Sequence, residues 1–79
     1  KKIVKTDALE ILSISLENGA TFPEHTSPKD AQLIVLEGEI VFHINGTSYQ
    51  LKTQQNFNFP KTTPHFVMAN ENSKFLIIR

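Results

Sequence analysis

Short runs of β-branched and aromatic residues, each closed by a turn residue, recur along this chain of 79 residues. No stretch repeats apolar residues at the i, i+3, i+4 and i+7 positions that an amphipathic helix requires. Short runs of this kind, bounded by Gly, Pro or Asn, are typical of β-strands. The pattern predicts strands over Ala8–Leu16, Thr21–His25, Gln32–Leu36, Glu39–Ile44, Ser48–Lys52, Phe57–Phe59, His65–Ala69 and Lys74–Ile78.

Many short strands at close spacing favour a sandwich or a barrel, which hides sheet edges that would otherwise pair between molecules. Asn45-Gly46, between two alternating runs, is the strongest hairpin signal in the sequence. The chain is short enough that we expect residues 1–79 to form a single domain around one small core. The predicted fold class is all-β, a small antiparallel β-barrel or jelly roll.

Alternation along these runs divides the side chains between two faces. In Asn56–Phe59 we expect both Phe inside and both Asn outside. Glu39–Ile44 turns one apolar face inward, which leaves its His43 on the opposite, surface-facing side. The residues predicted to lie inside the barrel are Leu33, Phe42, Phe57 and Phe59.

Charge and composition remove several classes of partner. Eight basic and eight acidic residues give zero net charge, so we expect neither a nucleic acid nor a membrane as partner. Without cysteine there is no disulfide, thiolate metal site or cysteine nucleophile. No apolar run approaches the roughly 20 residues of a membrane helix, and no secretory signal is visible. The expected location is the cytoplasm.

Two segments of the sequence contain Gly, His and Pro residues at fixed separations. Gly19 is followed after five residues by His25, and Gly38 closes this first segment, whose end falls in the strand–turn–strand stretch "LIVLEGEIVFHING". Downstream of "LKTQQNFNF", Pro60 and His65 keep a fixed spacing. These segments resemble the two motifs of the cupin superfamily, G-x5-H-x-H-x3,4-E-x6-G and G-x5-P-x-G-x2-H-x3-N. The resemblance implies a cupin barrel, also called a double-stranded β-helix.

The resemblance also implies a metal site, which this sequence has partly lost. In the family, two His and a Glu of the first motif and the His of the second hold one divalent metal. Here Ser27 replaces the second His and Ala31 replaces the Glu, so only His25 and His65 remain. Two imidazoles without a carboxylate are an incomplete ligand set for iron, manganese or zinc. We therefore predict no resident cofactor, while a weakly bound divalent metal at His25 and His65 stays open.

Further departures fall in the second motif and beside the first. Gln54 and Thr62 stand where the family carries glycine, and Ala69 stands where Asn is usual. Glu24 and Asp30 each lie one residue from a ligand position, but strand alternation turns them away from the interior. The spacing therefore favours the fold, and the lost residues argue against inherited chemistry.

The leading functional hypothesis is a module that binds a small, partly apolar molecule in the mouth of the barrel. One alternative is a metal-dependent cupin enzyme, dioxygenase- or isomerase-like, that uses His25 and His65; another is a non-catalytic oligomerisation module with a filled barrel. A hydrolase with Ser27 as nucleophile lacks visible oxyanion-hole donors and an orienting carboxylate. The expected ligand-binding residues are His25, Ser27, Phe42, Phe57, Phe59 and His65.

The sequence also predicts a homodimer. Ile34 and Leu36 are apolar on the face opposite Leu33 and Val35. A strand that is apolar on both faces needs cover on both, and cupins often dimerise through the outer face of one sheet. The alternative is that the N-terminal strand of the same chain folds across Ile34 and Leu36.

Overall fold

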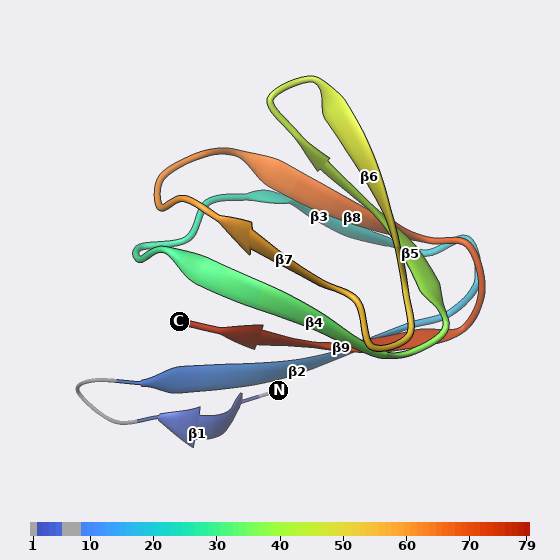
Figure 1. Cartoon of the computed structure of the whole chain (residues 1–79), viewed down its shortest axis with the longest axis horizontal. Coiled ribbons are helices and arrows are strands. Elements are labelled where there is room, and N and C mark those ends of the chain that lie inside the picture. Colours follow the sequence, from blue (N-terminus) through green and yellow to red (C-terminus); the bar gives the residue numbers. More distant parts are fainter. Residues whose placement is uncertain (1, 6–8) are drawn as a thin grey trace.

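Two antiparallel sheets face each other in the computed structural model, which describes residues 2–5 and 9–79 (Figure 1). The five-stranded sheet has the order β1-β2-β9-β4-β7, and the four-stranded sheet has the order β3-β8-β5-β6. Strands are the only regular elements among the described residues. Their bounds are β1 Lys2–Lys5, β2 Glu10–Leu16, β3 Thr21–His25, β4 Ala31–Glu37, β5 Glu39–Ile44, β6 Thr47–Lys52, β7 Asn56–Phe59, β8 His65–Ala69 and β9 Ser73–Ile78.

The strands predicted from the sequence are present, with ends shifted by a residue or two, and the all-β class is confirmed. The start of the first predicted strand, Ala8, lies outside the described residues. The pattern missed β1, which pairs with β2 at the edge of the five-stranded sheet. A run as short as Lys2–Lys5, with no turn residue to bound it, carries no strand signal of its own.

The core fills the space between the two sheets. Leu33, Phe42 and Phe59 are buried as predicted, while Phe57 points inward but is only half-buried. His43 lies on the outer face of the four-stranded sheet, where its ring stacks on that of Phe66 with centroids 4.2 Å apart. The alternation of apolar and polar residues thus assigned the faces correctly.

Two glycines have backbones that the connections require. Asn45 and Gly46 both have positive φ, 52° and 72°, which makes the tight hairpin between β5 and β6. Gly38, with φ of 86°, links β4 of one sheet to β5 of the other. A Cβ there would collide with the Asn72 carbonyl oxygen and the Ser73 Oγ. Gly38 is therefore fixed by both its conformation and its packing.

The outer face of the five-stranded sheet is apolar near its centre. Ile34 is half-buried and Leu36 is 48% exposed. The N-terminal strands do not cross this face, because β1 and β2 extend the same sheet beside β9 (Figure 1). The expectation that an N-terminal strand covers Ile34 and Leu36 is therefore wrong.

Candidate functional site

A bulge in β3 brings two aromatic rings to the inside of the barrel. Phe22 pairs with Val67 and His25 pairs with His65, so β3 has one residue more than β8 between these pairs. Strict alternation would place Phe22 and His25 on opposite faces, but the extra residue re-aims the strand. As a result both rings face the interior, with centroids 4.6 Å apart.

His25 and His65 meet at their outer ring nitrogens. The two Nε2 atoms are 3.1 Å apart, and the rings form an edge-to-face pair. Nδ1 of His25 lies 2.7 Å from the carbonyl oxygen of Pro23, and Nδ1 of His65 lies 2.8 Å from that of Thr63. A carbonyl oxygen only accepts hydrogen bonds, so each Nδ1 carries the proton and donates it. In the neutral rings the two Nε2 lone pairs therefore face each other with no donor between them.

Aromatic side chains surround the inner member of this pair. His65 is 1% exposed, stacks on Phe42 at 5.3 Å and contacts Phe59 at 4.6 Å between centroids. Burial lowers the pKa of His65, with smaller contributions from the neighbouring charges of His25 and Arg79, against a hydrogen bond to the Thr63 backbone that raises it. The interior thus favours the neutral imidazole with a bare Nε2.

Ser27 is buried near the pair but has other partners. Its Oγ donates to the carbonyl oxygen of Lys29 at 2.7 Å, and its own carbonyl oxygen accepts from the backbone N–H of Thr62 at 2.8 Å. These contacts tie the loop after β3 to the loop before β8. The hydroxyl holds backbone in place, so the arrangement does not offer a nucleophile activated by a histidine.

The residues present do not fit a resident metal ion. Ala31 is buried and supplies no donor, and Glu24 is exposed. Asp30 is exposed, and its Oδ1 accepts from the backbone N–H of Lys61 at 2.9 Å. Within residues 2–5 and 9–79, no three His, Cys, Asp or Glu side chains gather where they could hold a metal. Two imidazole nitrogens alone leave half of a four-ligand shell empty.

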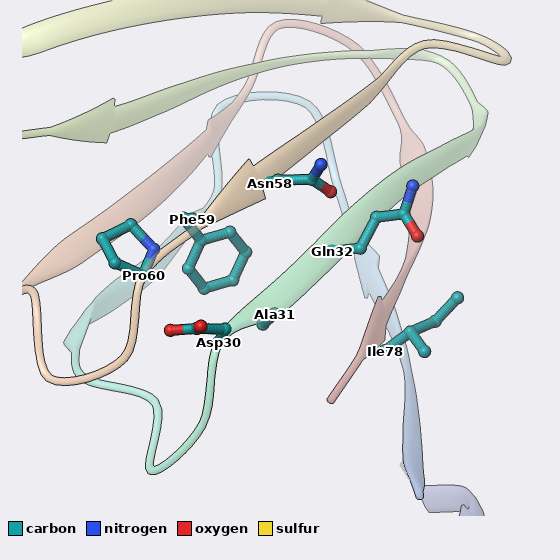
Figure 2. A pocket seen from close by; sticks show the side chains of 7 residues that line it. All are labelled: Asp30, Ala31, Gln32, Asn58, Phe59, Pro60 and Ile78. Atoms are coloured by element: carbon teal, nitrogen blue, oxygen red, sulfur yellow. The ribbon is translucent and has the colours of Figure 1, made fainter.

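A hollow opens at the ends of β4, β7 and β9. It has a volume of about 530 Å³ and includes Phe59 but neither histidine. Figure 2 shows the Asp30 carboxylate at the opposite end of this hollow from the amides of Gln32 and Asn58. The hollow is open to solvent, whereas the two facing Nε2 atoms of His25 and His65 lie in the aromatic interior. We therefore place the candidate site at the histidine pair.

The structure brings together five of the six residues expected to bind a ligand, namely His25, Phe42, Phe57, Phe59 and His65. Sequence reasoning missed Phe22 because the bulge reverses its face. It also missed Tyr49, whose ring contacts Phe57 at 4.5 Å between centroids. Tyr49 lies opposite Phe42 in the β5–β6 hairpin, and that register was readable from the Asn45-Gly46 turn.

Comparison with known proteins agrees with this architecture. The sequence model of the family described as the cupin domain matches residues 12–78, so the chain belongs to the cupin family. No curated protein matches the sequence. Within the described residues there is no helix long and apolar enough to cross a membrane.

Solved structures show how widely the architecture is shared. A conserved protein of unknown function from Streptococcus pyogenes is 28% identical, with a TM-score of 0.89 over 98% of this chain and 68% of that one. A cupin 2 conserved barrel domain protein from Leptotrichia buccalis is 30% identical, with a TM-score of 0.91 over 99% of this chain and 38% of that one. A cupin superfamily protein from Desulfitobacterium hafniense, 20% identical with a TM-score of 0.92 over 99% and 72%, shares the fold.

Proposed function

We propose that this cupin binds a small, partly apolar molecule that donates a hydrogen bond to the His25–His65 pair. The observation that carries the proposal is the 3.1 Å approach of two Nε2 atoms whose Nδ1 protons are already used by backbone carbonyls. Two facing acceptors gain a hydrogen bond when an O–H or N–H group lies beside them. The aromatic surroundings favour an apolar body on that group.

The direction of access follows from burial. His65 is 1% exposed, whereas His25, at the end of β3, is half-buried. A ligand would therefore reach the pair from the side of His25, with Phe22 and Phe59 beside it. The proposed role is binding, because Ser27 and Ala31 leave the pair without the ligands that would hold a reactive metal.

A metal-dependent enzyme is the second candidate, and one observation favours it. Metal-binding His usually donates its other ring N–H to a carbonyl or carboxylate, as both imidazoles do here. The missing carboxylate limits this candidate to a loosely held divalent ion, since two nitrogens make a weak site. Zn²⁺ titration of untagged protein separates the metal-dependent enzyme from the binding module. We expect Zn²⁺ to bind with an affinity weaker than micromolar, as the binding module predicts.

Phenol and toluene test the proposed function, because they share an aromatic body and differ in the O–H donor. We expect phenol to shift the histidine ring signals of His25 and His65 in NMR spectra saturably, and toluene to do so at least about tenfold more weakly. His25→Phe should abolish the response to phenol. His43→Phe is the matched control, since His43 lies on the outer face of the same sheet, where its ring stacks on Phe66 and not on the pair.

Equal responses to phenol and toluene would show that the pair does not select a donor, and would contradict the proposal. No saturable response to either probe would also contradict it. That second result would favour the remaining alternative, a filled barrel that serves only in oligomerisation.

A further inference from the structure

Arg79 lies on the inner face of the five-stranded sheet, at the end of the barrel that holds the histidine pair. Its backbone pairs with Glu10 through two hydrogen bonds, Glu10 N to Arg79 O and Arg79 N to Glu10 O at 2.9 Å. Phe75 and Ile77 are buried on the inner face of β9, so alternation points Arg79 to the same face. One step along the β4–β9 ladder from the Gln32–Ile78 pair puts Arg79 beside Ala31.

The end of the five-stranded sheet therefore carries a row of inward residues: Glu10, Arg79, Ala31 and Phe59. Opposite this row, the four-stranded sheet contributes His25, His65 and Ile44. The rings of Phe59 and His65, 4.6 Å apart between centroids, join the two rows. Arg79 thus faces the same end of the interior as the two imidazoles.

The carboxylate of the family motif is absent at this end, which carries the Arg79–Glu10 ion pair instead. Ala31 stands at the family's carboxylate position, and the nearest strand neighbour on that side is a guanidinium. Burial is the main cause of the lowered pKa of His65, and the positive charge of Arg79 lowers it further. Arg79 is therefore close enough to act electrostatically on His65.

The Arg79 guanidinium is held in place by Glu10, and this contact leaves most of its N–H donors available. Its Nε donates to Glu10 Oε1 at 2.6 Å, and the two side chains are only 18% and 13% exposed. A guanidinium has five N–H donors, and this contact uses one. The edge formed by its other nitrogens has the planar geometry that takes a carboxylate through two parallel hydrogen bonds. The hydrogen bond from Nε to Glu10 therefore fixes the orientation of the Arg79 guanidinium.

We propose that Arg79 recognises the anionic group of the ligand, and that the ligand is a small carboxylic acid with an O–H or N–H donor and an apolar body. This inference rests on the proposed function, since the donor goes to the His25–His65 pair. The carboxylate goes to Arg79, and the apolar body lies against the Phe59 ring, which contacts His65. A monoanion fits better than a doubly charged phosphate, because Glu10 already offsets part of the single positive charge.

Three probes separate the contributions: phenol carries only the donor, benzoate only the carboxylate, and 3-hydroxybenzoate both. We expect 3-hydroxybenzoate to bind at least about tenfold more tightly than phenol, the gain typical of a charge-assisted hydrogen bond. Arg79→Gln should remove this gain while phenol still binds, which also shows that the variant is folded. Glu10→Gln should strengthen binding of 3-hydroxybenzoate, because it removes the competing carboxylate.

Phenol binding without any gain from the carboxylate would overturn this inference and leave the proposed function standing. A gain that survives Arg79→Gln, or that falls in Glu10→Gln, would also overturn it, because Arg79 and Glu10 would then form only a structural ion pair. If benzoate binds through Arg79 and phenol does not bind, only the assignment of the carboxylate to Arg79 holds, and the donor rule of the proposed function fails. Failure of all three probes contradicts both.

Discussion

Thr62 holds a left-handed backbone, with φ of 61°, although it is β-branched and stands where the cupin motif carries glycine. The loop keeps this conformation because the backbone N–H of Thr62 donates to the Ser27 carbonyl oxygen at 2.8 Å. Gln54, at the other lost glycine of that motif, has the same kind of backbone, with φ of 71°. Both positions at which the second motif carries glycine therefore have a left-handed backbone here, although neither residue is glycine.

Replacing Thr62 by glycine should stabilise the fold. The left-handed conformation costs an ordinary L-residue about 1–2 kcal/mol, and the extra freedom of unfolded glycine cancels part of that gain, which leaves about 1 kcal/mol. Urea unfolding measures the change. Thr63→Gly is the control, because Thr63 has no positive φ and should lose stability instead. A less stable Thr62→Gly would show that the loop is not strained.

The stability of the protein should fall in mild acid because of His65. Burial lowers the pKa of His65 below its ordinary value of 6.5, so the folded state favours the neutral ring. On unfolding below about pH 6.5 the ring takes up a proton, so the free energy of unfolding falls as pH drops and levels off below the folded pKa. Urea midpoints across this range, compared with His65→Gln, test this prediction. Equal pH slopes in both proteins would refute it.

At the scale of elements, the two replaced ligand positions are Ser27, in the connection from β3 to β4, and Ala31, the first residue of β4. Restoring these ligands through Ser27→His with Ala31→Glu should create a four-ligand site with His25 and His65. We expect the double variant to purify with close to one equivalent of divalent metal, and the unchanged protein to carry far less. Elemental analysis of untagged protein measures both.

Each single variant is a control, because it should bind metal more weakly than the double one. A double variant that folds but stays free of metal would mean that Ser27 and Ala31 do not face the pair. A stoichiometric metal in the unchanged protein that survives chelation would contradict the absence of a resident ion.

Most strands and faces followed from the sequence because alternation and turn residues are local signals. In Asn56–Phe59 the pattern alone fixed which side chains are inside. The same rule failed at Phe22, because a bulge is set by pairing with β8 and not by the local sequence. The motif spacing brought His25 and His65 together correctly. It gave no sign of the 3.1 Å contact between their nitrogens or of Arg79, since both depend on cross-strand register.

At the scale of the molecule, the outer face of the five-stranded sheet is the surface most suited to self-association. We propose that it forms a homodimer, because Ile34 and Leu36 meet further half-buried apolar residues of β2 and β9 on that face. The chain has no net charge to oppose contact between copies. The same patch on both subunits would make a symmetric interface.

Ile34→Lys should therefore convert the dimer to monomer or aggregate, as measured by light scattering at micromolar concentration. Val41→Lys is the control, because it makes a similar change on the outer face of the other sheet. A monomeric mass for the unchanged protein that persists on concentration would rule the dimer out. So would an equal effect of the two substitutions.

The most direct test of the account is the protonation of the two facing imidazoles. A long-range proton–nitrogen NMR spectrum of ligand-free protein, recorded at about pH 8, above the ordinary pKa of an imidazole, reports which ring nitrogen carries the proton. The account predicts protonated Nδ1 and bare Nε2 in both His25 and His65, because each Nδ1 donates to a backbone carbonyl. A protonated Nε2 in either ring would mean that the pair satisfies itself, and it would contradict a site built to accept a ligand's hydrogen bond.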